Sequence, residues 1–171
     1  LGTRDNRIAL AYERGVPMGS DLNTAAAPRF WVWATQDPTG TPLDRIQIIK
    51  GWVENGEQRQ RVWDVVCSSG RKPNESGKCP ATTASVDLSS CQRTGGEGAR
   101  ELEVTFSDPD FSAEYPAFYY ARVLENPTCR WTTVLANSGN TDLPDDVPAI
   151  VQERGWSCLL YTSDAADEKV R

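Results

Sequence analysis

Two adjacent residues, Asn55 and Gly56, constrain the fold of this chain more than any other feature of its sequence. Asn-Gly is the strongest short signal for a two-residue β-hairpin turn, because both central residues of a type I′ turn need positive φ. The flanking segments 45–54 and 57–66 are rich in β-branched and aromatic residues. The sequence therefore predicts a long antiparallel hairpin over residues 45–66.

The two-residue turn also fixes the register of that hairpin, because side chains alternate between the two faces of a strand. We expect the residues on one face to pair as Glu54 with Glu57, Trp52 with Arg59, Ile48 with Trp63 and Ile46 with Val65. The two inner pairs, Ile48 with Trp63 and Ile46 with Val65, are predicted to form core. Trp52 is predicted to stack on Arg59 as a cation–π pair at the rim.

The sequences of other segments also predict short strands. Residues 29–34, 101–106 and 117–124 are β-branched, alternating or continuously apolar, and 149–156 is a weaker strand pattern. A short helix is predicted over 5–14, with Asp5 as its N-cap and Gly15 as its stop. We therefore expect a mainly β fold, with sandwich-like antiparallel sheets and one short N-terminal helix.

The absence of histidine excludes several kinds of chemistry from this chain acting alone. The sequence has 171 residues, no histidine, and a net charge of -6 from 18 basic and 24 acidic side chains. No Ser-His-Asp triad and no histidine-bearing metal site can be built from it. The acidic balance argues against a nucleic-acid partner, and the short apolar runs argue against a membrane span. We predict no catalytic residue and no metal ligand within the chain.

Four of the five cysteines are predicted to form disulfides: Cys67, Cys79, Cys91 and Cys129. Their spacings lack the tight C-x2-4-C pair of a zinc site, which leaves free thiols as the alternative. Four cysteines allow three connectivities. We prefer Cys67 with Cys79 and Cys91 with Cys129, because this pairing leaves the intervening strands unstrained. Disulfides would place the protein in an oxidising compartment.

The two ends of the sequence look cut. The first residue, Leu1, is not an initiator methionine, and no secretory signal pattern follows it. Residues 158–168, CLLYTSDAADE, resemble one reading frame of a transposase adapter used to prepare sequencing libraries. We therefore expect 158–171 to be a tail that is not native to the protein, in a chain that is a metagenomic gene fragment.

Three groups of residues could have either a binding role or a purely structural role. Asp108, Asp110 and Glu114 could bind calcium, but they lack the EF-hand spacing, and Pro109 favours a turn. Asp142, Asp145 and Asp146 read as a solvated loop. The aromatic residues could form a sugar-stacking face, for instance through Trp31, Trp33 or Trp52, but most alternate with aliphatic residues as in a core.

Several longer strings, in fixed order, resemble a known bacterial family. They are GVPMGSDL, PLDRIQIIKGWVENG, FSDPDFSAEYPAFYYARVLENPTCRW and IVQERGW, and they extend from about Tyr12 to Trp156. They are similar to the C-terminal portion of a family of unknown-function proteins in the polymerase-and-histidinol-phosphatase (PHP) superfamily of metal-dependent hydrolases. In that family a closing strand follows, and here the adapter-like tail replaces it after Ser157.

The resemblance implies a larger parent protein. Members of that family resemble exported hydrolases, with an upstream α/β barrel that holds divalent metals and cleaves phosphoesters or carbamate esters. No metal ligand of that barrel can be assigned here, so the implied partner is a barrel missing from this chain. The segment Gly15, Val16, Pro17, Met18 and Gly19 matches the family loop nearest the barrel and is expected to line a pocket, although Ser20 stands where the family usually has a second glycine. The four cysteines match a subset of members.

This reading divides the chain into three parts. Residues 1–27 are expected to connect to the missing barrel, 28–157 to form a β-sandwich-like accessory domain, and 158–171 to be the adapter-encoded tail. We expect the parent to be periplasmic or extracellular and this portion not to be catalytic by itself. The alternative is an independent secreted binding module that recognises carbohydrate.

Overall fold

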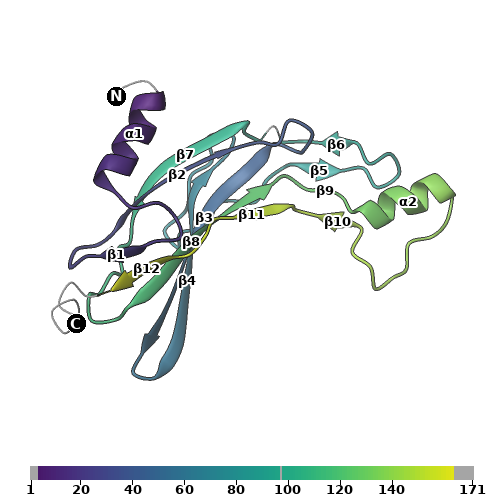
Figure 1. The fold of residues 1–171 in the computed structure, drawn as a ribbon. Helices are drawn as coiled ribbons and strands as arrows, with labels where there is room; N and C mark the ends of the chain where they lie inside the picture. The colour runs from purple at the N-terminus through teal and green to yellow at the C-terminus, as the bar shows by residue number, and fades with distance from the viewer. Residues whose placement is uncertain (1–3, 97, 164–171) are drawn as a thin grey trace.

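The computed structural model describes residues 4–96 and 98–163, and the hairpin is its longest feature (Figure 1). Strands β3 (Leu43–Glu54) and β4 (Glu57–Cys67) meet at a turn in which Asn55 has φ 52° and Gly56 has φ 80°. Both values are positive, as a type I′ turn requires. The predicted hairpin is thus confirmed.

Its register is as expected near the turn and shifts farther from it. Trp52 lies opposite Arg59 and Ile48 lies opposite Trp63, as predicted. Ile46, however, lies opposite Val66 and not Val65, because a β-bulge between Ile46 and Gln47 inserts one extra residue into β4. The predicted pairing of Ile46 with Val65 is therefore wrong, although Val65 still packs against the core.

The remaining elements are mostly short. In chain order they are α1 (Arg4–Arg14), β1 (Asp21–Asn23), β2 (Arg29–Thr35), β5 (Ser85–Val86), β6 (Arg93–Thr94), β7 (Glu101–Ser107), β8 (Ala117–Glu125), β9 (Thr128–Cys129), α2 (Trp131–Gly139), β10 (Ile150–Val151), β11 (Arg154–Trp156) and β12 (Leu160–Ser163). The mainly β fold class, with its short N-terminal helix, is confirmed. Asp5 lies inside α1, so it is not the N-cap, while the amide of Gly15 bonds the carbonyl of Ala11 where the helix ends.

The largest sheet has six strands, with β8 near its centre. One edge of β8 pairs with β3, and its other edge is shared by β11 and β12, all antiparallel. Strand β1 pairs in parallel with β12. Segments 21–23 and 160–163, outside the accessory domain expected from sequence, thus contribute strands to the same sheet.

A second sheet, made of β2 and β7 in antiparallel register, lies over the core face of β3 (Figure 1). The core between the sheets contains the rings of Phe30 and Tyr119, whose centroids are 4.8 Å apart, and those of Trp63 and Phe106, 5.3 Å apart. The buried residues of its two clusters are Leu43, Ile46, Ile48, Trp63, Leu102, Ala117, Tyr119 and Ala121. This sheet-on-sheet arrangement is the expected sandwich-like packing.

Two parts of the second half differ from expectation. Helix α2 was not predicted, and the single strand expected over 149–156 is two strands with different partners. Strand β10 pairs with β9, whereas β11 pairs with β8. The two strands cannot be continuous because they belong to different sheets.

Both preferred disulfides are present. Cys67 bonds Cys79 with Cα atoms 5.9 Å apart, and Cys91 bonds Cys129 with Cα atoms 5.6 Å apart. The first closes a loop beside β4, and the second ties the segment after β5 to β9, just before α2. The predicted cysteine pairing is confirmed. Of the helices within 4–96 and 98–163, neither is long and apolar enough to cross a membrane.

Candidate functional site

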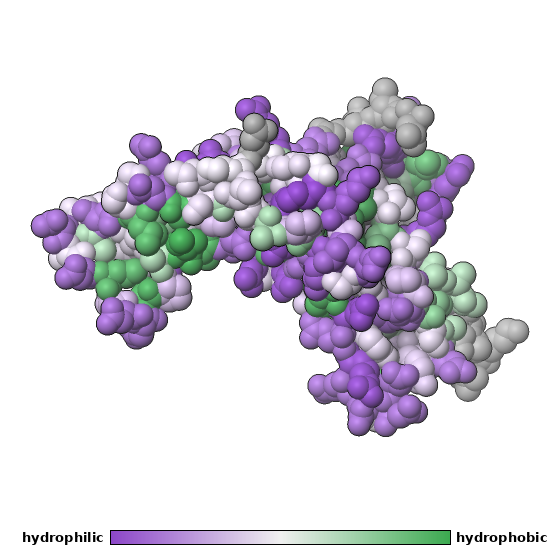
Figure 2. Space-filling view, turned by 180° about the vertical axis from the view of Figure 1, so that it is seen from behind, coloured by the Kyte–Doolittle hydropathy of each residue, from purple (hydrophilic) through white to green (hydrophobic). Residues whose placement is uncertain are grey.

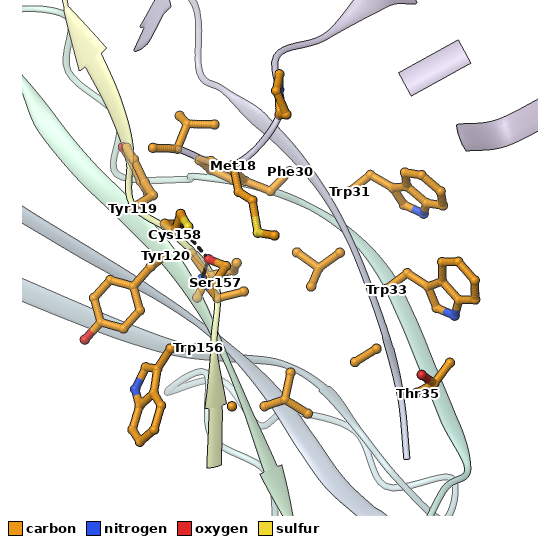
Figure 3. Close-up of a pocket in the computed structure, with 18 of the residues that line it drawn as sticks. Met18, Phe30, Trp31, Trp33, Thr35, Tyr119, Tyr120, Trp156, Ser157 and Cys158 are labelled. Carbon is orange, nitrogen blue, oxygen red and sulfur yellow. Dashed lines mark hydrogen bonds between the residues drawn. The ribbon is translucent and has the colours of Figure 1, made fainter. Parts of the chain in front are cut away.

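A pocket of about 730 Å³ opens between α1, the segment that follows it, β2 and β11 (Figure 3). We call it the β2–β11 groove. Val16, Pro17 and Met18 of the predicted loop line it, and Met18 points into the space between the two strands. The two glycines of that loop do not line the groove. Gly15 ends α1, and Gly19, at φ 92°, lets the chain turn past Cys158.

The floor of the groove consists of core side chains. Phe30, Ile48 and Tyr119 belong to the core cluster and also line the groove. Its rim carries large exposed side chains: Tyr12 is 70% exposed, Met18 64% and Trp156 60%. Apolar groups this exposed around a concave surface are typical of a site that binds another surface.

Helix α1 is tethered close to this groove by a polar contact. A guanidinium nitrogen of Arg7 lies 2.5 and 2.7 Å from the two carboxylate oxygens of Glu103 on β7. The indole N–H of Trp31 donates to the same carboxylate at 2.9 Å. These bonds join α1 to the face of β2 and β7 that points away from the core, which places Ala11 and Tyr12 at the groove.

One end of the groove is acidic. Asp37, Glu125 and Glu153 line it there, with Arg154 as their basic neighbour. The N–H of Thr39, followed by its hydroxyl, hydrogen-bonds to Asp37 and lowers the pKa of that carboxyl. The carboxylate of Glu125 accepts from the N–H of Thr41 at 3.1 Å and from its hydroxyl at 2.9 Å. These bonds hold the two carboxylates in place at this end.

The suspected calcium loop is a structural turn. Asp108 is buried, and its Oδ2 accepts from the ammonium of Lys50 at 2.7 Å and from the hydroxyl of Tyr119 at 2.7 Å. Its Oδ1 accepts from the N–H of Asp110 at 2.8 Å. Burial, followed by the bond to Asp108, raises the pKa of the Tyr119 hydroxyl far above its usual value. With both oxygens occupied, Asp108 is not a cation ligand.

The other buried carboxylates are also committed to protein partners. Asp44 is fully buried between the guanidinium groups of Arg45 and Arg71. Asp64 accepts from the amide of Gln47 at 2.5 Å and from the N–H of Cys79 at 2.7 Å. In residues 4–96 and 98–163, no group of three or more His, Cys, Asp or Glu side chains is placed to hold a metal ion.

The three tryptophans considered for sugar stacking do not share one surface. Trp31 and Trp33 lie on β2, on the side away from Met18 (Figure 3), whereas Trp52 lies on β3 of the other sheet. All three are half-buried. Trp52 has the ammonium of Lys50 at 4.9 Å from its ring centroid, and Arg59 instead bonds Glu57 at 2.6 Å. The predicted Trp52–Arg59 cation–π pair is thus replaced by Trp52 with Lys50.

A second apolar surface lies on α2, at the end of the molecule opposite α1 (Figure 2). Trp131, Val134 and Leu135 are exposed on this helix. Two further exposed side chains lie near it: Leu88, whose carbonyl accepts from the amide of Asn137 at 2.7 Å, and Ile150, which pairs with Cys129 just before the helix. The helix contributes one buried residue, Thr133, whose hydroxyl donates to the carbonyl of Ala149 at 2.8 Å. The sequence analysis did not predict this surface, because it did not predict α2.

The sequence analysis singled out the loop around Met18 but not residues 153–158, which also line the groove. The glycine and proline spacing around Met18 indicated a shaped loop. No local signal indicated that residues 153–158 would face β2, because that proximity depends on pairings between distant strands.

A protein-family model matches this chain, and its description names no activity. A family model described as "Protein of unknown function (DUF3604)" matches residues 2–163. That range includes α1, both walls of the groove and β12. No curated protein and no solved structure matches the chain. Because the family model covers nearly the whole sequence, the chain belongs to the DUF3604 family.

Proposed function

We propose that this chain is the C-terminal accessory portion of an exported, metal-dependent hydrolase of the PHP superfamily that cleaves phosphoesters or carbamate esters. In this proposal the chain does not catalyse the reaction itself. It packs beside the upstream barrel, which carries the metals. The observation that supports docking is the β2–β11 groove, where core side chains reach the surface beneath exposed Tyr12, Met18 and Trp156.

The residues of this chain do not fit the metal cluster that such a hydrolase needs. The chain has no histidine, and the buried carboxylates of Asp44, Asp64 and Asp108 are hydrogen-bonded or ion-paired to protein groups. A di- or trinuclear centre needs several free carboxylate and imidazole ligands. We therefore assign the metal ligands to the upstream barrel and no catalytic step to this chain.

The two disulfides support the exported location in this proposal. Cys67–Cys79 and Cys91–Cys129 both have Cα separations within the normal disulfide range. Disulfides persist in oxidising compartments such as the periplasm or the extracellular space.

Two measurements test this proposal. The purified chain, assayed with aryl phosphoesters and aryl carbamates in the presence of manganese or zinc, should give no turnover above a metal-only blank. The genomic reading frame upstream of Leu1 should continue without a stop and carry His-x-His and Asp-Thr-His-like motifs. Clear turnover by the chain, or an upstream frame without these motifs, would contradict the accessory role.

An independent carbohydrate-binding module is the alternative from a different class. It would present tryptophan faces to sugar rings, and the two most exposed tryptophans are Trp131 and Trp156. Affinity electrophoresis in gels that contain soluble polysaccharides distinguishes the two functions. The accessory role predicts unretarded migration, whereas retardation that Trp131→Ala or Trp156→Ala abolishes would favour the binding module.

A further inference from the structure

The residues that line the β2–β11 groove run consecutively along both of its walls. All seven residues of β2, 29–35, line one wall, and residues 153–158, which include β11, line the other. Because successive side chains of a strand point to opposite faces, a groove that contacts every residue in turn must run along the strand's edge. The groove is therefore bounded by two strand edges.

In the described part of the chain, no strand pairs with either of these edges on the groove side. Strand β2 pairs with β7 alone, and β11 pairs with β8 alone. Open edges present backbone N–H and C=O groups that can pair with another extended chain. The β12 edge differs, because β1 already covers it.

The hydrogen bonds next to β2 show which of its backbone groups face the groove. The N–H of Gln36 donates to the carbonyl of Arg100 at 2.8 Å, in line with the β2–β7 register. Antiparallel pairs alternate between bonded and non-bonded residues. Phe30, Val32 and Ala34 therefore bond to β7, whereas the backbone groups of Trp31 and Thr35 point away from β7.

The same reasoning applies to β11. The N–H of Ser157 donates to the carbonyl of Ala121 at 3.0 Å, and the N–H of Glu125 donates to the carbonyl of Glu153 at 3.0 Å. Residues 153, 155 and 157 thus bond to β8. The backbone groups of Arg154 and Trp156 point away from β8, so they and those of Trp31 and Thr35 border one apolar groove.

We propose that the β2–β11 groove binds an extended segment of the hydrolase's own catalytic portion as an added β-strand. The inference rests on the proposed function, which supplies the source of that segment. Main-chain bonds to Trp31, Thr35, Arg154 and Trp156 hold the strand, and its inward side chains cover Phe30 and Ile48. This is recognition by β-augmentation, in which backbone bonds give affinity and pockets give specificity.

The charges at the groove define one end of that strand. Asp37, Glu125 and Glu153 outnumber Arg154 where β2 ends. A lysine or arginine of the bound segment would be favoured there, and an acidic residue would be repelled. The expected occupant is thus an extended segment with alternating aliphatic residues and a basic residue at one end.

A synthetic peptide tests this chemistry on the chain as it exists. The probe is the capped peptide Lys-Val-Thr-Val-Thr-Val, and the controls carry Glu in place of Lys or Pro in place of both Thr residues. Amide hydrogen exchange should slow at Trp31, Thr35, Arg154 and Trp156 with the lysine peptide. The lysine peptide should bind about tenfold more tightly than the glutamate peptide, and the proline peptide should not bind.

Proline variants of the chain provide a matched pair. Thr35→Pro removes an outward N–H without touching the β2–β7 ladder, so it should weaken binding roughly fivefold, which is the loss of one net hydrogen bond. Gln58→Pro makes the same change on the open edge of β4, away from the groove, and should not alter binding. The exchange measurement on the unmodified chain stands even where a proline variant fails to fold.

Three results would overturn the inference: no slowed exchange at β2 and β11, equal binding of all three peptides, or equal effects of the two proline variants. The outcomes separate this inference from the proposed function. Peptide binding to a chain whose upstream frame lacks metal-ligand motifs would leave the groove assignment intact and remove the hydrolase. Metal-ligand motifs upstream of a chain that does not bind the peptide would leave the hydrolase proposal intact and remove the groove assignment.

Discussion

At the scale of single residues, Lys50 shows how a buried charge is stabilised in this small core. Its ammonium donates to Asp108 at 2.7 Å and to the carbonyl of Asp110 at 2.8 Å, and it lies 4.9 Å from the ring centroid of Trp52. The ion pair joins β3 to the turn between β7 and β8. A buried ion pair adds little stability relative to an apolar replacement of both residues. Removing only one partner, however, leaves the other charge buried and uncompensated.

Lys50→Met is therefore expected to destabilise the fold by about 3–5 kcal/mol, because it leaves the carboxylate of Asp108 buried without its cation. Chemical denaturation of the purified variant measures the change in the free energy of unfolding. Lys72→Met, at an exposed position, is the matched control and should change it by less than about 0.5 kcal/mol. Equal effects of the two variants would mean that the ion pair does not support the core.

Gly56→Val tests the turn that organises the hairpin. Gly56 has φ 80°, and no atom lies within 4 Å of a Cβ added there, so the cost comes from the backbone alone. We expect a loss of at least about 1 kcal/mol in the free energy of unfolding. Gln58→Val, on the adjacent strand, should be close to neutral, and a neutral Gly56→Val would show that the turn is not type I′.

At the scale of elements, the strands could be predicted where local pattern and final environment agree. Residues 101–106 alternate in sequence, and Leu102 is buried while Glu101 and Glu103 are exposed. Helix α2 could not be predicted in this way. Its sequence WTTVLANSG contains poor helix formers, and its N-cap Arg130 makes no side-chain capping bond. The neighbouring disulfide at Cys129 and the bond from Thr133 to Ala149 hold it in place.

The candidate site also could be predicted only where the local sequence pattern determines the structure. The loop around Met18 has a glycine and proline pattern that can be recognised locally. The two walls depend on long-range pairings: β11 pairs with β8, and β2 pairs with β7, more than sixty residues away in sequence. Long-range pairings of this kind leave no mark in the local pattern of either strand.

The Cys67–Cys79 disulfide is expected to stabilise the β4 end of the hairpin. Cys79→Ser opens a loop of 12 residues in sequence separation, which corresponds to roughly 3 kcal/mol in the chain-entropy model. Thermal unfolding with and without dithiothreitol measures this effect. Reductant should lower the Tm of the parent chain and lower that of Cys79→Ser less. An unchanged Tm of the parent under reductant would show that neither disulfide contributes.

At the scale of the whole molecule, two segments far apart in sequence, 21–23 and 160–163, lie side by side in one sheet. Strand β1, near the start, pairs in parallel with β12, which also pairs with β8, and the hydroxyl of Thr162 contacts the backbone of Ala117 at 3.2 Å. Residues 160–163 thus form a strand between β1 and β8, after Trp156, where the family resemblance places a closing strand. An adapter-encoded tail over 158–171 is compatible with this strand, because an open sheet edge accepts almost any extended backbone.

Residues 164–171 lie outside the described residues, and the adapter reading makes a prediction about them. A segment that was not selected with this fold should add nothing to its stability. Deleting Asp164–Arg171 is therefore expected to leave the Tm unchanged within error. A drop of several degrees would mean that this segment belongs to the protein, whereas deletion from Leu160 should lower the Tm because it removes β12.

In the proposed function, the catalytic portion of a larger protein covers the groove beside Met18. Met18 is the single methionine of the chain and is 64% exposed, so its oxidation by hydrogen peroxide reports directly on that surface. Mass spectrometry of the tryptic peptide 15–29 should show rapid sulfoxide formation in this chain and several times slower formation in a polypeptide that includes the proposed upstream barrel. Equal rates in the two proteins would contradict this coverage of the groove.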